Sequence, residues 1–167
     1  GQLEDHACGI QCCHESRDVD RGERFTAQVM LEAVLATHVA PVRYLPGWVI
    51  DLHILHPMRW ATQGTILAAE RALEVGFVVN LSGGYHHAKP DDGEGFSIYA
   101  DVGIAIGSLR RKVLIADSAR IAYVDTDAHQ GNGVCHTFMN DSRVFIFDIF
   151  NRNIYPSYDQ DARKRID

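Results

Sequence analysis

Long apolar runs are missing from this sequence of 167 residues. None approaches the roughly 20 consecutive apolar residues that a membrane-spanning helix needs. The N-terminus also lacks the basic-then-apolar order of a signal peptide. We therefore expect no membrane span and an intracellular protein. The chain is 46% apolar and 23% charged, which is typical of a globular domain rather than of a disordered or fibrous protein.

Basic residues are in the minority. The chain has 16 lysines and arginines against 22 aspartates and glutamates, so its formal net charge is −6. The one basic cluster, residues 163–165, is short and terminal. Proteins that hold nucleic acid by neutralising phosphates need a basic surface. The sequence therefore argues against a direct nucleic-acid partner.

Cysteine is scarce and does not follow a metal-binding pattern. Three of the four cysteines, Cys8, Cys12 and Cys13, lie in one polar stretch with His6 and His14. A zinc finger needs two well-separated pairs of ligands, which this spacing does not provide. Reduced thiols on a poorly ordered segment are the favoured interpretation, and a metal cluster is the alternative.

The apolar pattern divides the chain into a leader and a domain. Residues 1–24 are polar and aperiodic, so we interpret them as a poorly ordered leader before a domain over residues 25–167. Helical spacing predicts helices over 25–39, from 62 or 63 to 74, over 99–111 and over 134–139, with an irregular connection through residue 56. Short apolar runs predict buried strands over 77–81, 121–124 and 144–147. The alternating order favours an α/β fold, with a parallel sheet flanked by helices.

Two polar clusters follow predicted strands. The first reads Ser-Gly-Gly-Tyr-His-His over residues 82–87, and the second reads Asp-Thr-Asp-Ala-His-Gln-Gly-Asn-Gly over residues 125–133. In an open parallel sheet, ligands bind just past the carboxyl ends of the strands. The two clusters are therefore expected to meet in space.

The second cluster contains a candidate metal site. In an extended segment, residues two apart point the same way, so Asp125, Asp127 and His129 can direct two carboxylates and an imidazole toward one point. Carboxylate oxygen and imidazole nitrogen suit zinc or a neighbouring divalent transition metal. The alternative is that an aspartate caps the following turn and His129 lies on the surface.

The first cluster contains adjacent histidines, His86 and His87. One imidazole could act as a general base and the other as its electrostatic partner. Each would need an acceptor for its second nitrogen, and Asp125 and Asn132 are the available residues. A histidine pair can also be a surface accident, but a second polar cluster at the next strand end favours function.

Four stretches of the sequence together resemble a known family. GGYHHAKPDDGEGF, YADVGIAI, YVDTDAHQGNG and VFIFDIFNRNIYP resemble, in order and spacing, the catalytic core of zinc-dependent histone deacetylases. HQGNG and NRNIYP are most similar to class IV, and the resemblance covers Ala40 to Pro156. It implies the arginase/deacetylase fold, a Zn²⁺ cofactor and hydrolysis of acyl-lysine amides in a histone or other protein. It also implies a location in the nucleus, the cytoplasm or both.

The resemblance implies roles for individual residues. Asp127 and His129 would be two of three zinc ligands, and the pair His86 and His87 would lie above the metal, with His87 as principal general base. Asp125 would orient His86.

Other residues match supporting positions of the family. Asn132 would meet His87, and it stands where most of the family has an aspartate, so His87 would lack a charged partner. Asp125 also matches a residue that helps to hold a potassium ion together with backbone carbonyls around Asp148 and Ile149. Gly84 and Phe96 match positions that line a narrow acyl channel.

The resemblance also predicts that parts of the family's active site are missing from this sequence. The family's third zinc ligand, an aspartate, and the tyrosine that polarises the substrate carbonyl come from segments beyond the last residue of this sequence. We therefore interpret residues 25–167 as a partial catalytic domain. One alternative is an inactive truncated isoform or gene-model fragment that at most binds a partner or metal. Another is a related metal hydrolase of small amides, although HHAKPDDGEGF and DAHQGNG argue against the arginase type.

Overall fold

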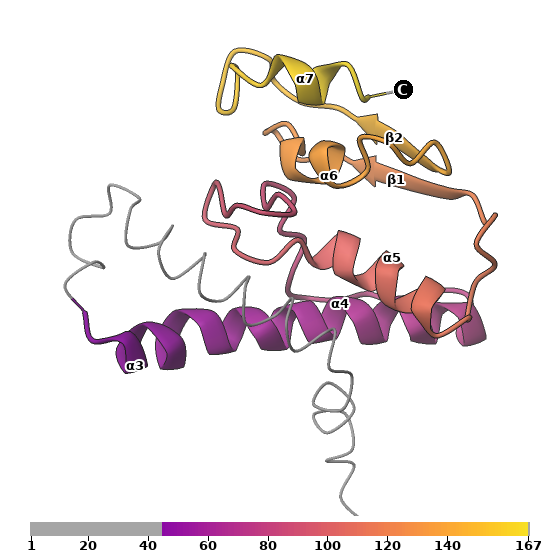
Figure 1. The fold of residues 1–167 in the computed structure, drawn as a ribbon, viewed down its shortest axis with the longest axis horizontal. Coiled ribbons are helices and arrows are strands. Elements are labelled where there is room, and N and C mark those ends of the chain that lie inside the picture. Colours follow the sequence, from indigo (N-terminus) through magenta and orange to yellow (C-terminus); the bar gives the residue numbers. More distant parts are fainter. Residues whose placement is uncertain (1–44, 167) are drawn as a thin grey trace, which may run out of the picture. The chain divides into compact units, whose positions relative to one another are not determined.

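The computed structural model describes residues 45–166 (Figure 1). The predicted leader and the predicted helix over residues 25–39 lie outside the described residues. The order of elements is α3 (Gly47–Ile50), π-helix η2 (Asp51–Leu55), α4 (His56–Val75), α5 (Asp101–Arg111), β1 (Ile121–Asp125), α6 (Asn132–Thr137), β2 (Val144–Asp148) and α7 (Gln160–Arg163).

The first helical segment is longer than its sequence pattern predicts. Elements α3, η2 and α4 follow one another directly, so the predicted irregular connection through residue 56 is wrong. Pro57 lies in the first turn of α4, where its missing N–H and its ring disturb the preceding turn. The π-helix lies immediately before it, and the N–H of His56 bonds the carbonyl of Asp51, five residues back. This wider turn accommodates the proline without ending the helix.

The end of α4 follows the sequence prediction. Gly76 has a φ of 87°, in the left-handed region, and its N–H donates to the carbonyl of Ala72 at 2.8 Å. A residue without Cβ adopts this conformation without steric cost. Further along the chain, helix α5 packs along α4 (Figure 1).

The predicted strand over residues 77–81 is not formed. Phe77 is 79%, Val79 62% and Leu81 96% exposed. A strand is stabilised by pairing its backbone groups with a neighbour, and among residues 45–166 only β1 and β2 form a sheet. The apolar run therefore has neither a paired strand nor a packed face here.

The other two strands pair in parallel, as the sequence predicts. The register runs from Ile121 opposite Val144 to Asp125 opposite Asp148. Burial differs from the prediction because residues 45–166 cover one face of the sheet and leave the other open: Ile146 is fully buried, whereas Val124 is 61% exposed. The α/β class with a parallel sheet and helices is confirmed.

The hydrophobic core lies between the covered face of the sheet and helices α5, α6 and α7. Its buried members come from α5, α6, β2, α7 and the turn after α6, and they are Ile106, Val134, Cys135, Phe138, Val144, Ile146 and Ala162. This packing fixes the carboxyl ends of β1 and β2, where the polar residues lie. Within the described residues, no helix is long and apolar enough to cross a membrane.

Candidate active site

The first histidine of the pair contacts the end of β1. Nδ1 of His86 lies 2.8 Å from Oδ2 of Asp125, and this carboxylate also accepts from the hydroxyl of Tyr123 at 2.7 Å and from the N–H of Asp127 at 3.0 Å. Burial raises the pKa of Asp125, but these hydrogen bonds outweigh it and lower the pKa to about 2. Asp125 is therefore an ionised acceptor at neutral pH.

The second histidine contacts the start of α6. Nδ1 of His87 lies 2.8 Å from Oδ1 of Asn132, and both residues are buried. The two imidazole rings are 4.1 Å apart between centroids, so the predicted meeting of the two polar clusters occurs. His86 has a carboxylate partner and His87 has a neutral one.

With these different partners, the pKa values of the two histidines shift in opposite directions. Burial lowers the pKa of His86, but the hydrogen bond and charge of Asp125 and the charge of Asp127 outweigh it and raise the pKa above its ordinary value. Burial lowers the pKa of His87, and the nearby His86 and His129 lower it further, whereas the hydrogen bond to Asn132 only partly opposes them. The pair thus combines an imidazole that favours its charged form with one that favours its neutral form.

Glycines allow the loops to approach each other this closely. A Cβ on Gly133 would lie 2.3 Å from the carbonyl oxygen of Ala88, and a Cβ on Gly131 would lie 2.7 Å from Oδ2 of Asp125. Any larger residue would push the start of α6 away from the histidines. This explains the two glycines on either side of Asn132.

Asp101 anchors the loop that carries the histidines. This fully buried carboxylate at the start of α5 accepts from the N–H of Gly84 at 2.7 Å, the N–H of Tyr85 at 2.9 Å and the hydroxyl of Thr65 at 2.7 Å. Sequence analysis missed this role. A signal was available, because an acidic residue in the first turn of a predicted helix often accepts hydrogen bonds from backbone N–H groups.

The proposed zinc ligands lie beside the histidine pair. Oδ1 of Asp127 is 3.0 Å from Nδ1 of His129 and accepts from its backbone N–H at 2.7 Å. Both side chains are about half exposed, and Nε2 of His86 lies 3.8 Å from the same oxygen of Asp127. The two donor atoms therefore lie next to each other on side chains that solvent can reach.

The chemistry of these two donors fits zinc. A carboxylate oxygen and an imidazole nitrogen are common zinc ligands, and catalytic zinc normally has three protein ligands. Within residues 45–166, no group of three His, Cys, Asp or Glu side chains is arranged to hold a metal ion. The described part of the chain therefore offers a pair of donors and no complete metal site.

The predicted potassium and channel residues lie around the same loops. The side-chain oxygens of Asp125 are occupied by hydrogen bonds, and its backbone carbonyl accepts from the N–H of Ile149 at 3.1 Å. Gly84 and Phe96 both have positive φ values, 76° and 59°. Phe96 is 91% exposed, so its side chain does not pack against the histidines. The potassium and channel assignments stay predictions.

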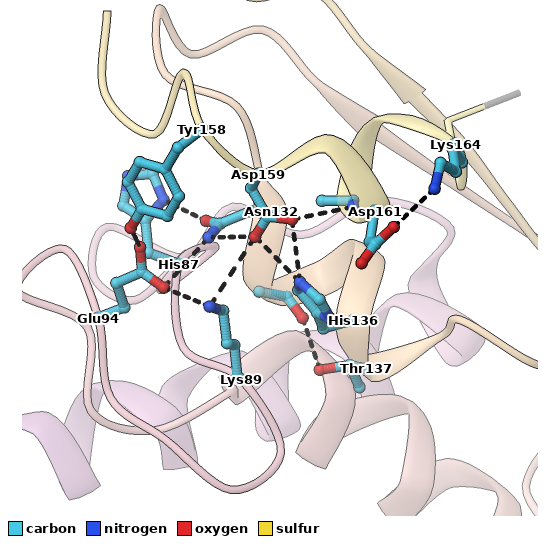
Figure 2. A network of polar contacts seen from close by, with 12 residues as sticks. His87, Lys89, Glu94, Asn132, His136, Thr137, Tyr158, Asp159, Asp161 and Lys164 are labelled. Atoms are coloured by element: carbon cyan, nitrogen blue, oxygen red, sulfur yellow. Dashed lines mark hydrogen bonds and ion pairs between the residues drawn. The ribbon is translucent and has the colours of Figure 1, made fainter.

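A further polar cluster, which sequence analysis missed, lies beside His87 (Figure 2). Glu94 accepts from Lys89 at 2.6 Å, from the hydroxyl of Tyr155 at 2.7 Å and from the hydroxyl of Tyr158. The ring of Tyr155 packs edge-on against that of His87, with 5.0 Å between centroids. No motif indicated this cluster, because its members are up to 69 residues apart.

Comparison with known proteins identifies the family. The family model described as "Histone deacetylase domain" matches residues 10–166. The match begins within the predicted leader, and the domain boundary near residue 24 stays a prediction.

Named relatives agree with this match. Histone deacetylase 2 of Arabidopsis thaliana is 40% identical over 131 residues, which cover 78% of this chain and 33% of that protein. Histone deacetylase 8 of Xenopus laevis is 36% identical over 96 residues, which cover 55% of this chain and 28% of that protein. The chain thus spans about a third of the length of these relatives.

Solved structures show the same fold. A histone deacetylase homologue from Aquifex aeolicus superimposes with a TM-score of 0.51 and 31% identity, covering 58% of this chain and 26% of that chain. A homologue solved in complex with SAHA gives the same TM-score and identity, covering 59% of this chain and 26% of that chain. The predicted deacetylase-like fold is confirmed. With the family match spanning residues 10–166 and the same fold in these structures, the chain belongs to the histone deacetylase family.

Proposed function

We propose that this chain forms the zinc-binding part of a domain that hydrolyses acyl-lysine amides in a histone or other protein. One observation carries the proposal: the dyads His86–Asp125 and His87–Asn132 lie side by side, each with an acceptor 2.8 Å from its Nδ1. Because each acceptor lies at Nδ1, Nε2 of each imidazole is available for proton transfer. Paired and oriented imidazoles of this kind serve proton transfer.

Asp127 and His129 would hold the zinc ion with a third ligand from elsewhere in the protein. A zinc ion held there would supply Lewis-acid chemistry, which polarises a substrate carbonyl and makes water more acidic. Asp127 contributes a carboxylate and His129 a neutral imidazole, and both lie next to the histidine pair.

The two histidines would share the proton chemistry. His87 is the base, because its neutral form is favoured and its Nε2 is free to accept a proton. His86 is the electrostatic partner, because Asp125 favours its protonated form. This division assigns different roles to two residues that are adjacent in sequence.

Further assignments follow from the resemblance in sequence. We assign the chain to class IV, which HQGNG and NRNIYP support. Gly84 and Phe96 would line the acyl channel, and Asp125 would help to hold a potassium ion. The protein would act in the nucleus, the cytoplasm or both, without a direct nucleic-acid partner, which the net charge of −6 supports.

The test uses Asp127→Ala and His129→Ala in a complete deacetylase domain. Both variants should lose most of the bound zinc and most of the hydrolysis of acetyl-lysine and long-chain acyl-lysine peptides. His53→Ala and Asp161→Ala are matched controls, because these exposed residues lie outside the site. Undiminished zinc content in either site variant would contradict the assignment.

A second candidate function is a binding module without catalysis. The observation in its favour is that residues 45–166 supply two converging zinc donors and no group of three. Turnover separates the two candidates, because a binding module would hydrolyse no acyl-lysine peptide even as part of a complete domain.

A further inference from the structure

The amide of Asn132 is fully buried and has partners at both ends. Its oxygen, Oδ1, lies 2.8 Å from Nδ1 of His87. Its nitrogen, Nδ2, donates to Oε2 of Glu94 at 3.3 Å and to Oδ2 of Asp159 at 3.2 Å (Figure 2). The amide nitrogen therefore faces two carboxylates.

The two carboxylates decide which way the amide points. An ionised carboxylate only accepts hydrogen bonds, whereas an asparagine side chain donates from nitrogen and accepts at oxygen. The reverse orientation would place the oxygen of Asn132 against the two carboxylates of Glu94 and Asp159. It would also lose two charge-assisted hydrogen bonds in a buried position. The oxygen of Asn132 must therefore face His87.

This orientation fixes the tautomer of His87. The oxygen of Asn132 can only accept, so Nδ1 of His87 must carry the hydrogen of the neutral imidazole. The unshared electron pair then lies on Nε2. A donor facing Nδ1 would select the opposite tautomer, in which Nε2 carries a hydrogen and cannot accept a proton.

Both carboxylates are themselves held in place. Asp159 accepts from the backbone N–H of Ala162 at 3.0 Å and lies 2.9 Å from Nε2 of His136. Glu94 is held by Lys89 and by two tyrosine hydroxyls. Neither carboxylate can turn away without losing these contacts. Both therefore stay in place as acceptors and fix the orientation of the Asn132 amide.

We propose that Glu94 and Asp159 are positioning residues that orient the amide of Asn132 and thereby keep His87 in its Nδ1–H tautomer. They do not touch the reacting atoms. They act through a neutral side chain, which transmits an orientation but not a full charge. The catalytic meaning of this tautomer rests on the function proposed above, whereas the tautomer itself does not.

The test measures the tautomer directly in the chain labelled with ¹⁵N-histidine. Long-range ¹H–¹⁵N correlation at a pH well above the ordinary histidine pKa of about 6.5 should show a protonated Nδ1 and an unprotonated Nε2 for His87. The His87→Gln variant, which lacks the signal, assigns it among the nine histidines. An Nε2–H tautomer in the unaltered chain would overturn the inference without any further variant.

The double variant Glu94→Gln with Asp159→Asn removes the acceptor-only constraint. Both new amides can donate as well as accept, so Asn132 can turn over and His87 should become a mixture of tautomers. Each substitution keeps an oxygen, so the contacts to Ala162 and Tyr155 can persist. Asp161→Asn is the matched control, because this exposed carboxylate pairs with Lys164 and not with Asn132 (Figure 2). An unchanged single tautomer in the double variant would contradict the proposal.

Activity provides a separate readout in a complete domain. The double variant should lower kcat by about 10- to 100-fold while KM and zinc content change little. If the isolated chain shows the Nδ1–H tautomer but a complete domain hydrolyses no acyl-lysine peptide, the proposed function fails and the positioning role stands. If a complete domain hydrolyses acyl-lysine peptides while His87 carries its hydrogen on Nε2, the positioning role fails and the proposed function stands.

Discussion

At the scale of single residues, neighbouring side chains determine how far the pKa values of two histidines differ. His86 and His87 share a loop and a comparable degree of burial, yet one pKa rises and the other falls. The difference follows from their acceptors, since Asp125 carries a charge and Asn132 does not.

The first prediction concerns His87. The His87→Ala variant of a complete domain should cleave acyl-lysine peptides roughly 10²-fold more slowly while its zinc content is unchanged. Steady-state kinetics and metal analysis measure the two effects. A loss of less than tenfold would indicate that His86 is the base.

The second prediction concerns Asn132. In the background of Glu94→Gln with Asp159→Asn, an aspartate at position 132 would meet amides and not carboxylates with its second oxygen. It would then accept the hydrogen bond of His87 and add a negative charge, so it should raise the pKa of His87. Adding Asn132→Asp to this double variant should therefore move the acidic limb of its rate–pH profile to higher pH. An unmoved limb would show that the charge does not reach the catalytic base.

The third prediction concerns Cys135, a buried free cysteine. Burial, followed by the charge of Asp148, raises the pKa of this thiol to about 12. The thiol should resist alkylation in the folded chain and react on unfolding, measured in a variant with Cys8, Cys12 and Cys13 changed to Ser. Because the unfolded pKa is about 8.5, the stabilisation is fully present below that value and is lost as the pH rises toward 12. Rapid alkylation of the folded chain at neutral pH would contradict this burial.

At the scale of secondary structure elements, glycines in different backbone conformations have different effects. Gly76 ends α4 with a positive φ, whereas Gly107 lies inside α5, and at both positions an added Cβ would meet no described atom within 4 Å beyond the adjacent residues and the backbone of its own helix. Any effect of adding a methyl group therefore comes from the backbone and not from a clash.

The fourth prediction uses these two glycines as a matched pair. Gly76→Ala should lower the free energy of unfolding by about 1 kcal/mol, because alanine is disfavoured at positive φ. Gly107→Ala should raise the free energy of unfolding by roughly 0.5 to 1 kcal/mol, because glycine is less favourable than alanine inside a helix. Chemical denaturation measures both, and equal effects of the two changes would contradict the assigned conformations.

At the scale of the whole molecule, the described residues leave one face of the sheet open. Val124 and Phe147 are opposite each other in the register and are 61% and 42% exposed, and Phe145 on the same strand as Phe147 is 48% exposed. Apolar surface of this kind marks a place where further protein structure packs or where aggregation begins.

The fifth prediction is that the isolated chain neither holds zinc tightly nor hydrolyses acetyl-lysine or long-chain acyl-lysine peptides. Among residues 45–166 no third side chain is arranged with Asp127 and His129 to hold a metal ion, and two ligands would leave the ion mostly hydrated. The assay needs a monodisperse sample with added zinc. Turnover that disappears in the His129→Ala control would show that another residue of this chain completes the site.

The sequence by itself determined the features that depend on local chemistry. The helix over α5, the C-terminal end of α4 and the two apolar strands β1 and β2 follow from short-range spacing, and they occur close to the predicted positions. The same holds for the order of motifs, which was enough to indicate the family. The meeting of the two polar clusters was also expected, but from two strand ends, whereas residues 77–81 form no strand and Asp101 holds the histidine loop instead. The pairing of His86 with Asp125 and of His87 with Asn132 was implied by the family resemblance.

Tertiary structure alone decided the features that depend on distant partners. Residues 77–81 have the composition of a strand but no paired neighbour among the described residues, so they form none. Glu94 and Asp159 are 65 residues apart and lack a shared motif, yet both contact the amide of Asn132. Strand pairing and buried hydrogen bonds need a partner at a specific position in space, and residue spacing along the chain does not supply that position.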